Sequence, residues 1–151
     1  MKIDFHSTDP QHIANLGDLK QYYQKDDPGY PYITQRPVIY NQFAASHLTD
    51  EGHQLRVRWL ETYEDDLMRA FINPDFIEKL CRKRNDGHYS ITLITELRPG
   101  SRKEGRFLTV AVSLSLEPVG GHHQITTIHP SKWTDLYYAD GNLKGKYLRL
   151  K

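Results

Sequence analysis

The sequence predicts an α+β fold in which N-terminal helices pack on one face of a four- to five-stranded antiparallel β-sheet. Its hydrophobic period changes along the chain: apolar residues recur every three or four positions before Gly87 and alternate with polar residues after it. Its 151 residues suffice for one domain with a modest core. Helices that precede strands in this way are typical of the α+β class.

Composition divides the chain near residue 49 into an accessory segment and a main domain. Residues 1–48 are rich in tyrosine and proline, and we expect them to pack on the main domain as one short helix and an irregular wrap. That helix is predicted over residues 10–23, with Asp9 as its N-cap. Its buried stripe would consist of Ile13, Leu16, Leu19 and Tyr22 or Tyr23. The α+β domain occupies residues 49–151.

Two helices are predicted at the start of the main domain. The first covers residues 51–71, because Thr49 is a good capping residue and the acids that follow suit the positive end of the helix dipole. Its buried face consists of apolar residues at helical spacing: Leu55, Trp59 or Leu60, Tyr63, Leu67, Met68 and Phe71. An Asn-Pro pair at 73–74 ends it and begins a second helix. The second helix directs three apolar residues inward: Phe76, Ile77 and Leu80.

Strands are predicted wherever apolar and polar residues alternate after Gly87. The three longest cover residues 89–97, 108–116 and 122–128. Residues 135–138 and 146–150 are candidates for a short fourth strand and a terminal strand. Short turn-rich connections between the long strands favour an antiparallel meander.

Charge and cysteine content exclude several classes of protein. The 20 basic and 19 acidic side chains leave a net charge of +1, which lacks the strong basicity of duplex-DNA binders, so no DNA partner is expected. Cys81 alone forms neither an internal disulfide nor a thiolate zinc site. The chain has no signal-peptide core and no apolar stretch long enough for a bilayer. We expect a cytoplasmic protein, or one that a partner system delivers into the cytoplasm of a target cell.

A run of histidine and threonine late in the chain indicates a functional site. Residues 120–130 carry three imidazoles and two hydroxyls on a predicted strand, where side chains that pack are the usual content. Strict alternation places His123, Thr127 and His129 on one face and His122 and Thr126 on the other. Thr127 with His129 is the favoured pair, because open sites occur at strand ends and Pro130 ends this strand.

Several strings resemble one group of nucleases. They are Arg58-Trp59-Leu60, the segment 73–77 with sequence NPDFI, and the segment 125–130 with sequence ITTIHP. Two long predicted strands lie between segments 73–77 and 125–130. Together they resemble the phage-associated and contact-dependent toxin branch of the barnase, EndoU, colicin and RelE-like (BECR) ribonucleases. The likeness covers residues 49–150. It implies a helical pair followed by a four-stranded antiparallel sheet, one strand of which lines the active cleft.

The resemblance implies a toxin-like, metal-independent endoribonuclease that acts through the RNA 2′-hydroxyl and needs no cofactor. Its substrate would be tRNA or another structured RNA, and a cognate immunity or antitoxin protein would be a partner. Such chemistry requires a base, an acid and donors to the phosphate. His53 and His129 are the predicted proton-transfer pair, with Arg56 and Thr127 completing the catalytic set. The predicted substrate-binding residues are Arg58, Thr126, His123, Lys146 and Tyr147.

Each of these assignments has a structural alternative. His53 is equally well explained as a polar residue of the first helical turn, and threonine is an ordinary strand residue. The whole chain is also compatible with a noncatalytic interaction module, such as an antitoxin, immunity or phage accessory protein, that binds through its tyrosines and the aromatic patch at 133–138. A zinc site at His122, His123 and His129 is disfavoured, because the sequence has no HExxH-type spacing.

Overall fold

The computed structural model describes residues 3–23, 36–49, 54–83, 85, 87–97, 106–117 and 120–151. The strands of this part of the chain are β1 (Gln11–Asn15), β2 (Pro37–Tyr40), β3 (Phe76–Glu78), β4 (Arg82–Lys83), β5 (Tyr89–Glu96), β6 (Phe107–Ser113), β7 (His123–Ser131) and β8 (Tyr147–Arg149). Its helices are α1 (Gln42–Leu48), α2 (Gln54–Thr62), α3 (Glu64–Ile72), α4 (Trp133–Leu136) and a 3₁₀ turn, η1 (Lys20–Tyr22).

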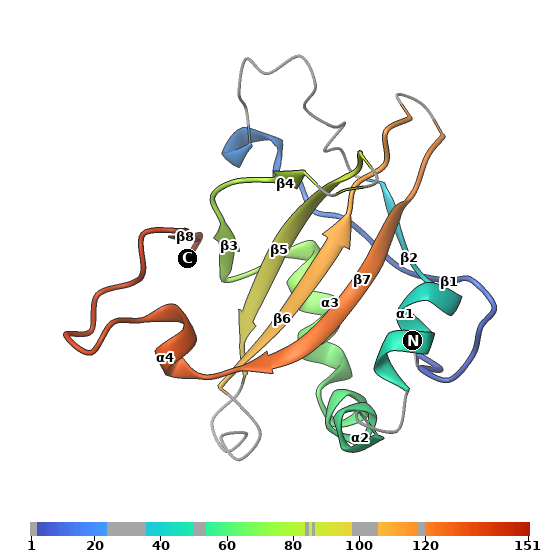
Figure 1. Cartoon of the computed structure of the whole chain (residues 1–151), viewed down its shortest axis with the longest axis horizontal. Helices are drawn as coiled ribbons and strands as arrows, with labels where there is room; N and C mark the ends of the chain where they lie inside the picture. Colours follow the sequence, from blue (N-terminus) through green and yellow to red (C-terminus); the bar gives the residue numbers. More distant parts are fainter. Residues whose placement is uncertain are drawn as a thin grey trace.

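All the described strands belong to one mixed sheet (Figure 1). Its order is β1-β2-β7-β6-β5-β3-β8, and β4 also pairs with β5. The β2–β7 pair is parallel, whereas the remaining pairs are antiparallel. Strands from both ends of the chain therefore flank the central β5–β6–β7 meander.

The predicted fold class is wrong in two respects. The sheet has eight strands in the described part and is mixed, not four- to five-stranded and antiparallel. Strands also precede the helices, because β1 and β2 come before α1 and enter the sheet beside β7. The 1–48 segment thus contributes strands to the same sheet and residues to the same core as the meander, including Ile13 and Val38.

The predicted 10–23 helix is replaced by β1 and η1. Its apolar residues are nevertheless buried as the stripe predicted: Ile13, Leu16, Leu19 and Tyr23. Tertiary contacts override the local preference, since Gly17 N–H donates to the Phe71 carbonyl at 2.8 Å. A Cβ on Gly17 would lie 2.2 Å from the Ile72 carbonyl oxygen, so only glycine lets this segment pass so close to the end of α3.

The predicted long helix divides at Tyr63 into α2 and α3. Thr62 Oγ1 donates to the Arg58 carbonyl at 3.1 Å, a contact within a helix that favours bending. Glu64, Asp65 and Asp66 then place negative charge in the first turn of α3, where the helix dipole favours it.

Two other helix and strand predictions are exchanged in the structure. The second predicted helix, which begins at Pro74, is replaced by β3 and β4. β3 pairs with both β5 and β8, and β4 pairs with β5. The expected strand at 135–138 is replaced by α4, where Asp135 accepts a hydrogen bond from Lys132 N–H at 2.7 Å. The three long strands and the terminal strand are confirmed as β5, β6, β7 and β8. The prediction that Pro130 ends the third strand is wrong, because β7 continues through Pro130, which pairs with Leu108, to Ser131.

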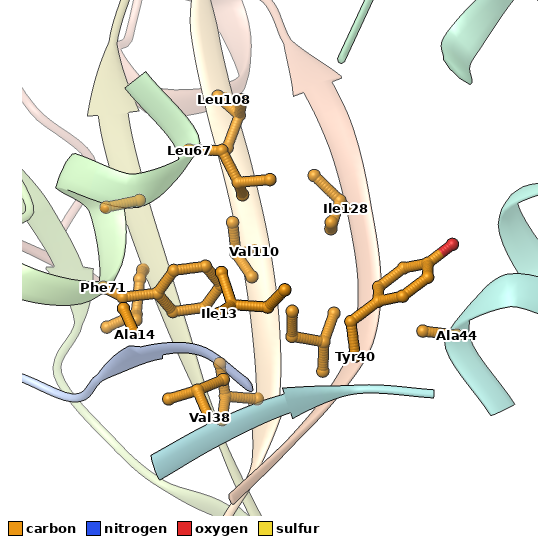
Figure 2. Close-up of a cluster of buried hydrophobic side chains, with 14 of the residues drawn as sticks. Ile13, Ala14, Val38, Tyr40, Ala44, Leu67, Phe71, Leu108, Val110 and Ile128 are labelled. Atoms are coloured by element: carbon orange, nitrogen blue, oxygen red, sulfur yellow. The ribbon is translucent and has the colours of Figure 1, made fainter. Parts of the chain in front are cut away.

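The main core lies between α3 and one face of the sheet (Figure 2). Leu67 and Phe71 of α3 point toward Val110 of β6 and Ile128 of β7, and the N-terminal strands close the same space with Ile13. Burial of such side chains stabilises the fold by about 2 kcal/mol each relative to exposure. No helix in the described part of the chain is long and apolar enough to cross a membrane.

The opposite face of the sheet is covered only in part among the described residues. A smaller cluster of Phe76, Ile94, Phe107, Leu136 and Tyr147 packs α4 over one end of it. The rest carries half-buried side chains of β5, β6 and β7, and the viewer of Figure 1 looks onto this side, with α3 behind it. We call this surface the open face: Ser90, Thr92, Ala111, Ser113, Gln124, Thr127 and His129.

Candidate functional site

A β-bulge in β7 divides its polar residues between the two faces of the sheet. Ile125 pairs with Val112, but Thr127 pairs with Ala111, so Thr126 is an extra residue in the ladder. Strict alternation was expected to keep His123 on the face of Thr127 and His129. The bulge breaks that alternation, and the strand before it presents His123 to the main core.

His123 is a core residue whose imidazole is fixed by the backbone. Its relative exposure is 0%, and its Nδ1 accepts a hydrogen bond from Ser115 N–H at 2.9 Å. A backbone N–H only donates, so the neutral imidazole carries its proton on Nε2. Because it is buried in the main core, His123 lies on the face of the sheet opposite to the one that carries Thr127 and His129.

His129 has the reverse tautomer and lies on the open face. Its Nδ1 is 3.1 Å from the Pro130 carbonyl oxygen, which only accepts, so Nδ1 carries the proton. The ring is half-buried, and in this tautomer Nε2 holds the lone pair that a general base needs.

Hydroxyl side chains occupy positions next to His129 in the ladder and along its strand. Its partner across the ladder is Thr109, whose Oγ1 lies 2.8 Å from Ser131 Oγ. Thr127 precedes it on the same face and is half-buried. Thr126, in the bulge, uses its hydroxyl to donate to the Ala111 carbonyl at 3.1 Å. Thr127 is therefore the hydroxyl of this strand that shares an accessible surface with His129.

The remaining predicted residues are dispersed or outside the described part. His53 and the side chain of Arg56 lie outside the described residues. Arg58 is exposed on α2, a helix that contacts α1 and α3. Lys146 is exposed with its Nζ 5.1 Å from the centre of the Tyr147 ring, and Tyr147 is buried under α4.

Strand positions separate that last pair from His129. Lys146 and Tyr147 lie at the start of β8, four positions from β7 in the sheet order. Neighbouring strands are about 4.8 Å apart, so this separation is about 20 Å. The structure brings together Thr127 and His129 from the predicted set and keeps Lys146 and Tyr147 away from them.

A groove at the other end of the open face contains residues that the sequence prediction did not select. We call it the histidine groove; it has a volume of about 500 Å³. Its lining consists of Phe43, His88, Ser113, Leu114, Ser115, Leu116, Glu117, His122 and Gln124. His88 comes directly before the predicted strand 89–97 and begins its alternation of polar and apolar residues. Phe43 lines the same groove only because α1 packs beside β7.

Arg36 stands behind this groove as a buried cation. Its guanidinium donates to Ser115 Oγ at 3.2 Å and to the carbonyl oxygen of Glu117. Gly121 makes room for it, because a Cβ there would lie 2.9 Å from Arg36 Nη1 and 2.0 Å from Ser115 Oγ. Gly120 has a φ of +76°, a conformation that favours glycine. The two glycines ahead of β7 thus permit a turn packed against the arginine.

Asn41 and Gln124 form a second polar support beside the groove. Asn41 Nδ2 donates to Gln124 Oε1 at 2.9 Å, and the Gln124 amide returns a hydrogen bond to Asn41 Oδ1. Asn41 also caps α1 by accepting from Phe43 N–H at 3.1 Å. This pair holds the first turn of α1, and with it Phe43, next to β7.

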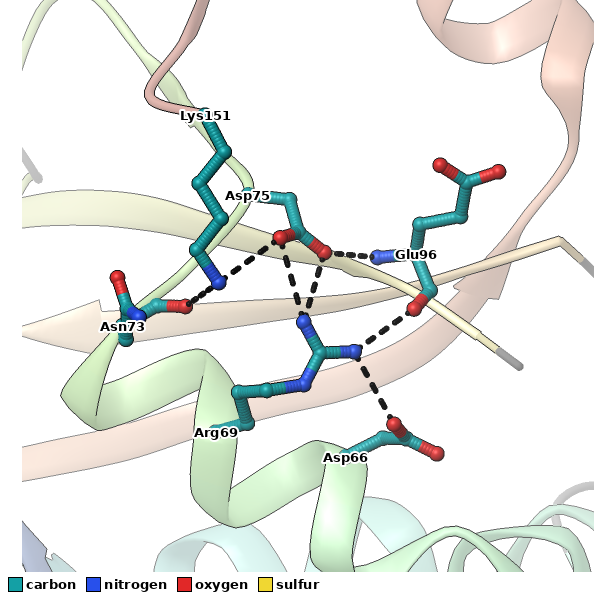
Figure 3. A network of polar contacts seen from close by, with 6 residues as sticks. All are labelled: Asp66, Arg69, Asn73, Asp75, Glu96 and Lys151. Carbon is teal, nitrogen blue, oxygen red and sulfur yellow. Dashed lines mark hydrogen bonds and ion pairs between the residues drawn. The ribbon is translucent and has the colours of Figure 1, made fainter.

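A third polar cluster is a structural brace (Figure 3). Arg69 of α3 donates to Asp75 Oδ2 at 3.0 Å, to Asp66 Oδ1 at 3.1 Å and to the Glu96 carbonyl at 2.9 Å. Burial acts to raise the pKa of Asp75, but hydrogen bonds from Glu96 N–H, Lys151 and Arg69 outweigh it and hold that pKa below its ordinary value. These groups satisfy one another, so the cluster ties α3 to the sheet and to the C-terminal segment.

Metal ligands do not converge in the described residues, where no group of three or more His, Cys, Asp or Glu side chains could hold an ion. Comparison with known proteins found no family model, no curated protein and no solved structure that matches this chain.

Proposed function

We propose that this protein is a metal-independent endoribonuclease whose reaction takes place on the open face at His129. The observation that carries the proposal is the hydrogen bond from His129 Nδ1–H to the Pro130 carbonyl. It orients the ring and leaves the lone pair on Nε2, and the His129 side chain is half-buried on the open face. A base held by a second group in this way is a common feature of acid–base sites.

The chemistry follows from the 2′-hydroxyl of RNA. His129 Nε2 takes the 2′-hydroxyl proton, the 2′-oxygen attacks the neighbouring phosphorus, and the bond from phosphorus to the 5′-oxygen breaks. A proton donor, for which His53 is the sequence-based prediction, protonates the departing 5′-oxygen. The products are a 2′,3′-cyclic phosphate and a 5′-hydroxyl, so atoms and charge balance without a metal. Thr127 donates to a nonbridging phosphate oxygen.

The test is cleavage of total RNA in excess EDTA. Wild-type protein is expected to cut, and His129→Ala to lower the rate at least about 100-fold, the usual contribution of a general base. His53→Ala is expected to be impaired in the same assay. His6→Ala is the matched control, because His6 is exposed in an N-terminal turn, and it should retain the wild-type rate. RNA that stays intact with wild-type protein, or full activity in His129→Ala, contradicts the proposal.

A noncatalytic protein-interaction module is the second candidate, and one observation favours it. Leu80 is 68% exposed and lines a cavity of about 620 Å³ together with Tyr22 and Leu148, on the side of the sheet that carries β8. Exposed apolar side chains beside a cavity are typical of sites that bind another protein. The RNA cleavage assay separates the two candidate functions, because an interaction module leaves RNA intact. If the protein is a ribonuclease, Leu80→Glu should cleave at the wild-type rate.

A further inference from the structure

The histidine groove and His129 lie at opposite ends of the open face. Ser113 and Gln124 pair across β6 and β7 on the open face and also line the groove. His129 lies on the same face further along β7. His122 and His129 are seven positions apart in the chain, and with the bulge between them this corresponds to about 20 Å of strand. No single nucleotide reaches both ends, whereas a strand of several nucleotides does.

Hydrogen-bond donors gather at the groove end, and one buried cation lies behind them. His88 and His122 lie on its wall, and Arg36 lies behind it within hydrogen-bonding distance of Ser115. Imidazole N–H and serine hydroxyl groups donate to phosphate oxygens, and a buried guanidinium adds a fixed positive potential. Glu117 is the one acid among the residues that line the groove, and its carboxylate repels an anion bound there.

An exposed aromatic ring completes the groove. Phe43 is 56% exposed at the start of α1, where the Asn41–Gln124 amide pair fixes the helix against β7. Phenylalanine stacks on unpaired bases, and base–aromatic stacking next to phosphate donors is the usual mode of single-strand recognition. Bases inside a duplex are stacked on one another and do not offer a face to such a ring.

We propose that the histidine groove is a second contact site for RNA, which holds a phosphodiester and stacks an unpaired base several nucleotides from the bond cut at His129. This proposal rests on the proposed function for the identity of the ligand. It names the substrate as a single-stranded stretch, such as the loop of a structured RNA. His88, His122 and Phe43 are the binding residues, and Arg36 positions Ser115.

The test is binding of fluorescent oligonucleotides whose riboses are all 2′-O-methylated, so that cleavage is impossible. The octanucleotide is expected to bind at least about tenfold more tightly than the dinucleotide, since only the longer strand reaches both ends. His122→Ala, His88→Ala and Phe43→Ala should each weaken octanucleotide binding about tenfold. Glu117→Gln should tighten octanucleotide binding, because it removes a negative charge and keeps the backbone carbonyl that Arg36 uses.

Controls keep the binding result independent of folding and of catalysis. His6→Ala should bind as wild type, and thermal unfolding of each variant excludes a loss caused by misfolding. His122→Ala is the most informative variant, because the side chain is exposed and the fold does not need it. Equal affinity for the two lengths, or octanucleotide affinity in His122→Ala within twofold of the control, overturns the second contact site. If either of these results is found but the wild-type protein cleaves total RNA, the second contact site is wrong and the endoribonuclease proposal is still supported. If octanucleotide binding depends on His122 but total RNA is not cleaved, the contact site is supported and the endoribonuclease proposal is wrong.

Discussion

Ser115 N–H donates to His123 Nδ1 at 2.9 Å, which joins the end of β6 to the start of β7 inside the core. His122, the preceding residue, is exposed and lines the histidine groove. Two adjacent histidines therefore have different roles, one in the core and one on the surface. Substitution of each gives a direct comparison between them.

His123→Ala is expected to lower the free energy of unfolding by about 3 kcal/mol, because it leaves a cavity and removes the acceptor of Ser115 N–H. His122→Ala should change it by less than about 0.5 kcal/mol, as is usual for a surface position. Urea unfolding measures both. Equal stability of the two variants would contradict the core position of His123.

Asp75→Asn is expected to remove an acid-sensitive part of the stability. Because the folded state holds the pKa of Asp75 below its ordinary value, its carboxylate stabilises the fold above the unfolded-state pKa, and this contribution disappears as pH falls through the folded-state pKa. At pH 7 the variant should be less stable by about 1.5 kcal/mol, since Arg69 is 35% exposed and keeps its contacts with Asp66 and the Glu96 carbonyl. The difference should shrink below about pH 4.

Unfolding at a series of pH values measures that difference. Asp18→Asn is the matched control, because Asp18 is exposed between β1 and η1. A loss in Asp75→Asn that stays constant down to the lowest pH would show that the carboxylate charge is not what stabilises the brace.

Gly121→Ala is expected to disturb the histidine groove. The added Cβ would lie 2.0 Å from Ser115 Oγ and 2.9 Å from Arg36 Nη1, so it would clash with both side chains. The free energy of unfolding should fall by about 2 kcal/mol, and octanucleotide binding should weaken because Ser115 is displaced. Gly145→Ala is the control, since no atom lies within 4 Å of a Cβ built there. Binding and urea unfolding that match this control would show that the turn is not tightly packed.

The sequence was informative where local pattern alone decides the structure. Alternation predicted β5, β6 and β7, because their residues are half-buried or packed in the period of a strand. It failed for β3, whose two apolar residues, Phe76 and Ile77, fit a helix as well as a strand until β5 and β8 pair with them. Ile13 was likewise expected to be buried, but on a helix, and only pairing of β1 with β2 makes its segment a strand.

The candidate site could be predicted only in part for a related reason. Thr127 and His129 share a face because both follow the bulge, whereas His123 precedes it. The bulge is marked in the sequence only by the spacing of Ile125 and Ile128, which are both fully buried although they are three positions apart and strict alternation would place them on opposite faces. The groove depends on Phe43, His88 and His122, which are distant in sequence and converge only through the sheet. Polar alternation identified His88 as exposed to a surface but could not identify which residues share that surface.

Product analysis of a defined oligonucleotide tests the central claim most directly. A single-stranded RNA containing one ribose with a free 2′-hydroxyl among 2′-O-methyl riboses is incubated with wild-type protein and His129→Ala in excess EDTA, and the fragments are weighed by mass spectrometry. We predict that the wild-type protein cleaves only after the ribose with the free 2′-hydroxyl and leaves a 2′,3′-cyclic phosphate end. The rate should be at least about 100-fold lower in His129→Ala. Two results would contradict the claim that His129 is the general base of a ribonuclease. One is that wild-type protein leaves the oligonucleotide intact after extended incubation, across a panel of sequences that includes tRNA loops. The other is that wild-type protein and His129→Ala cleave at the same rate.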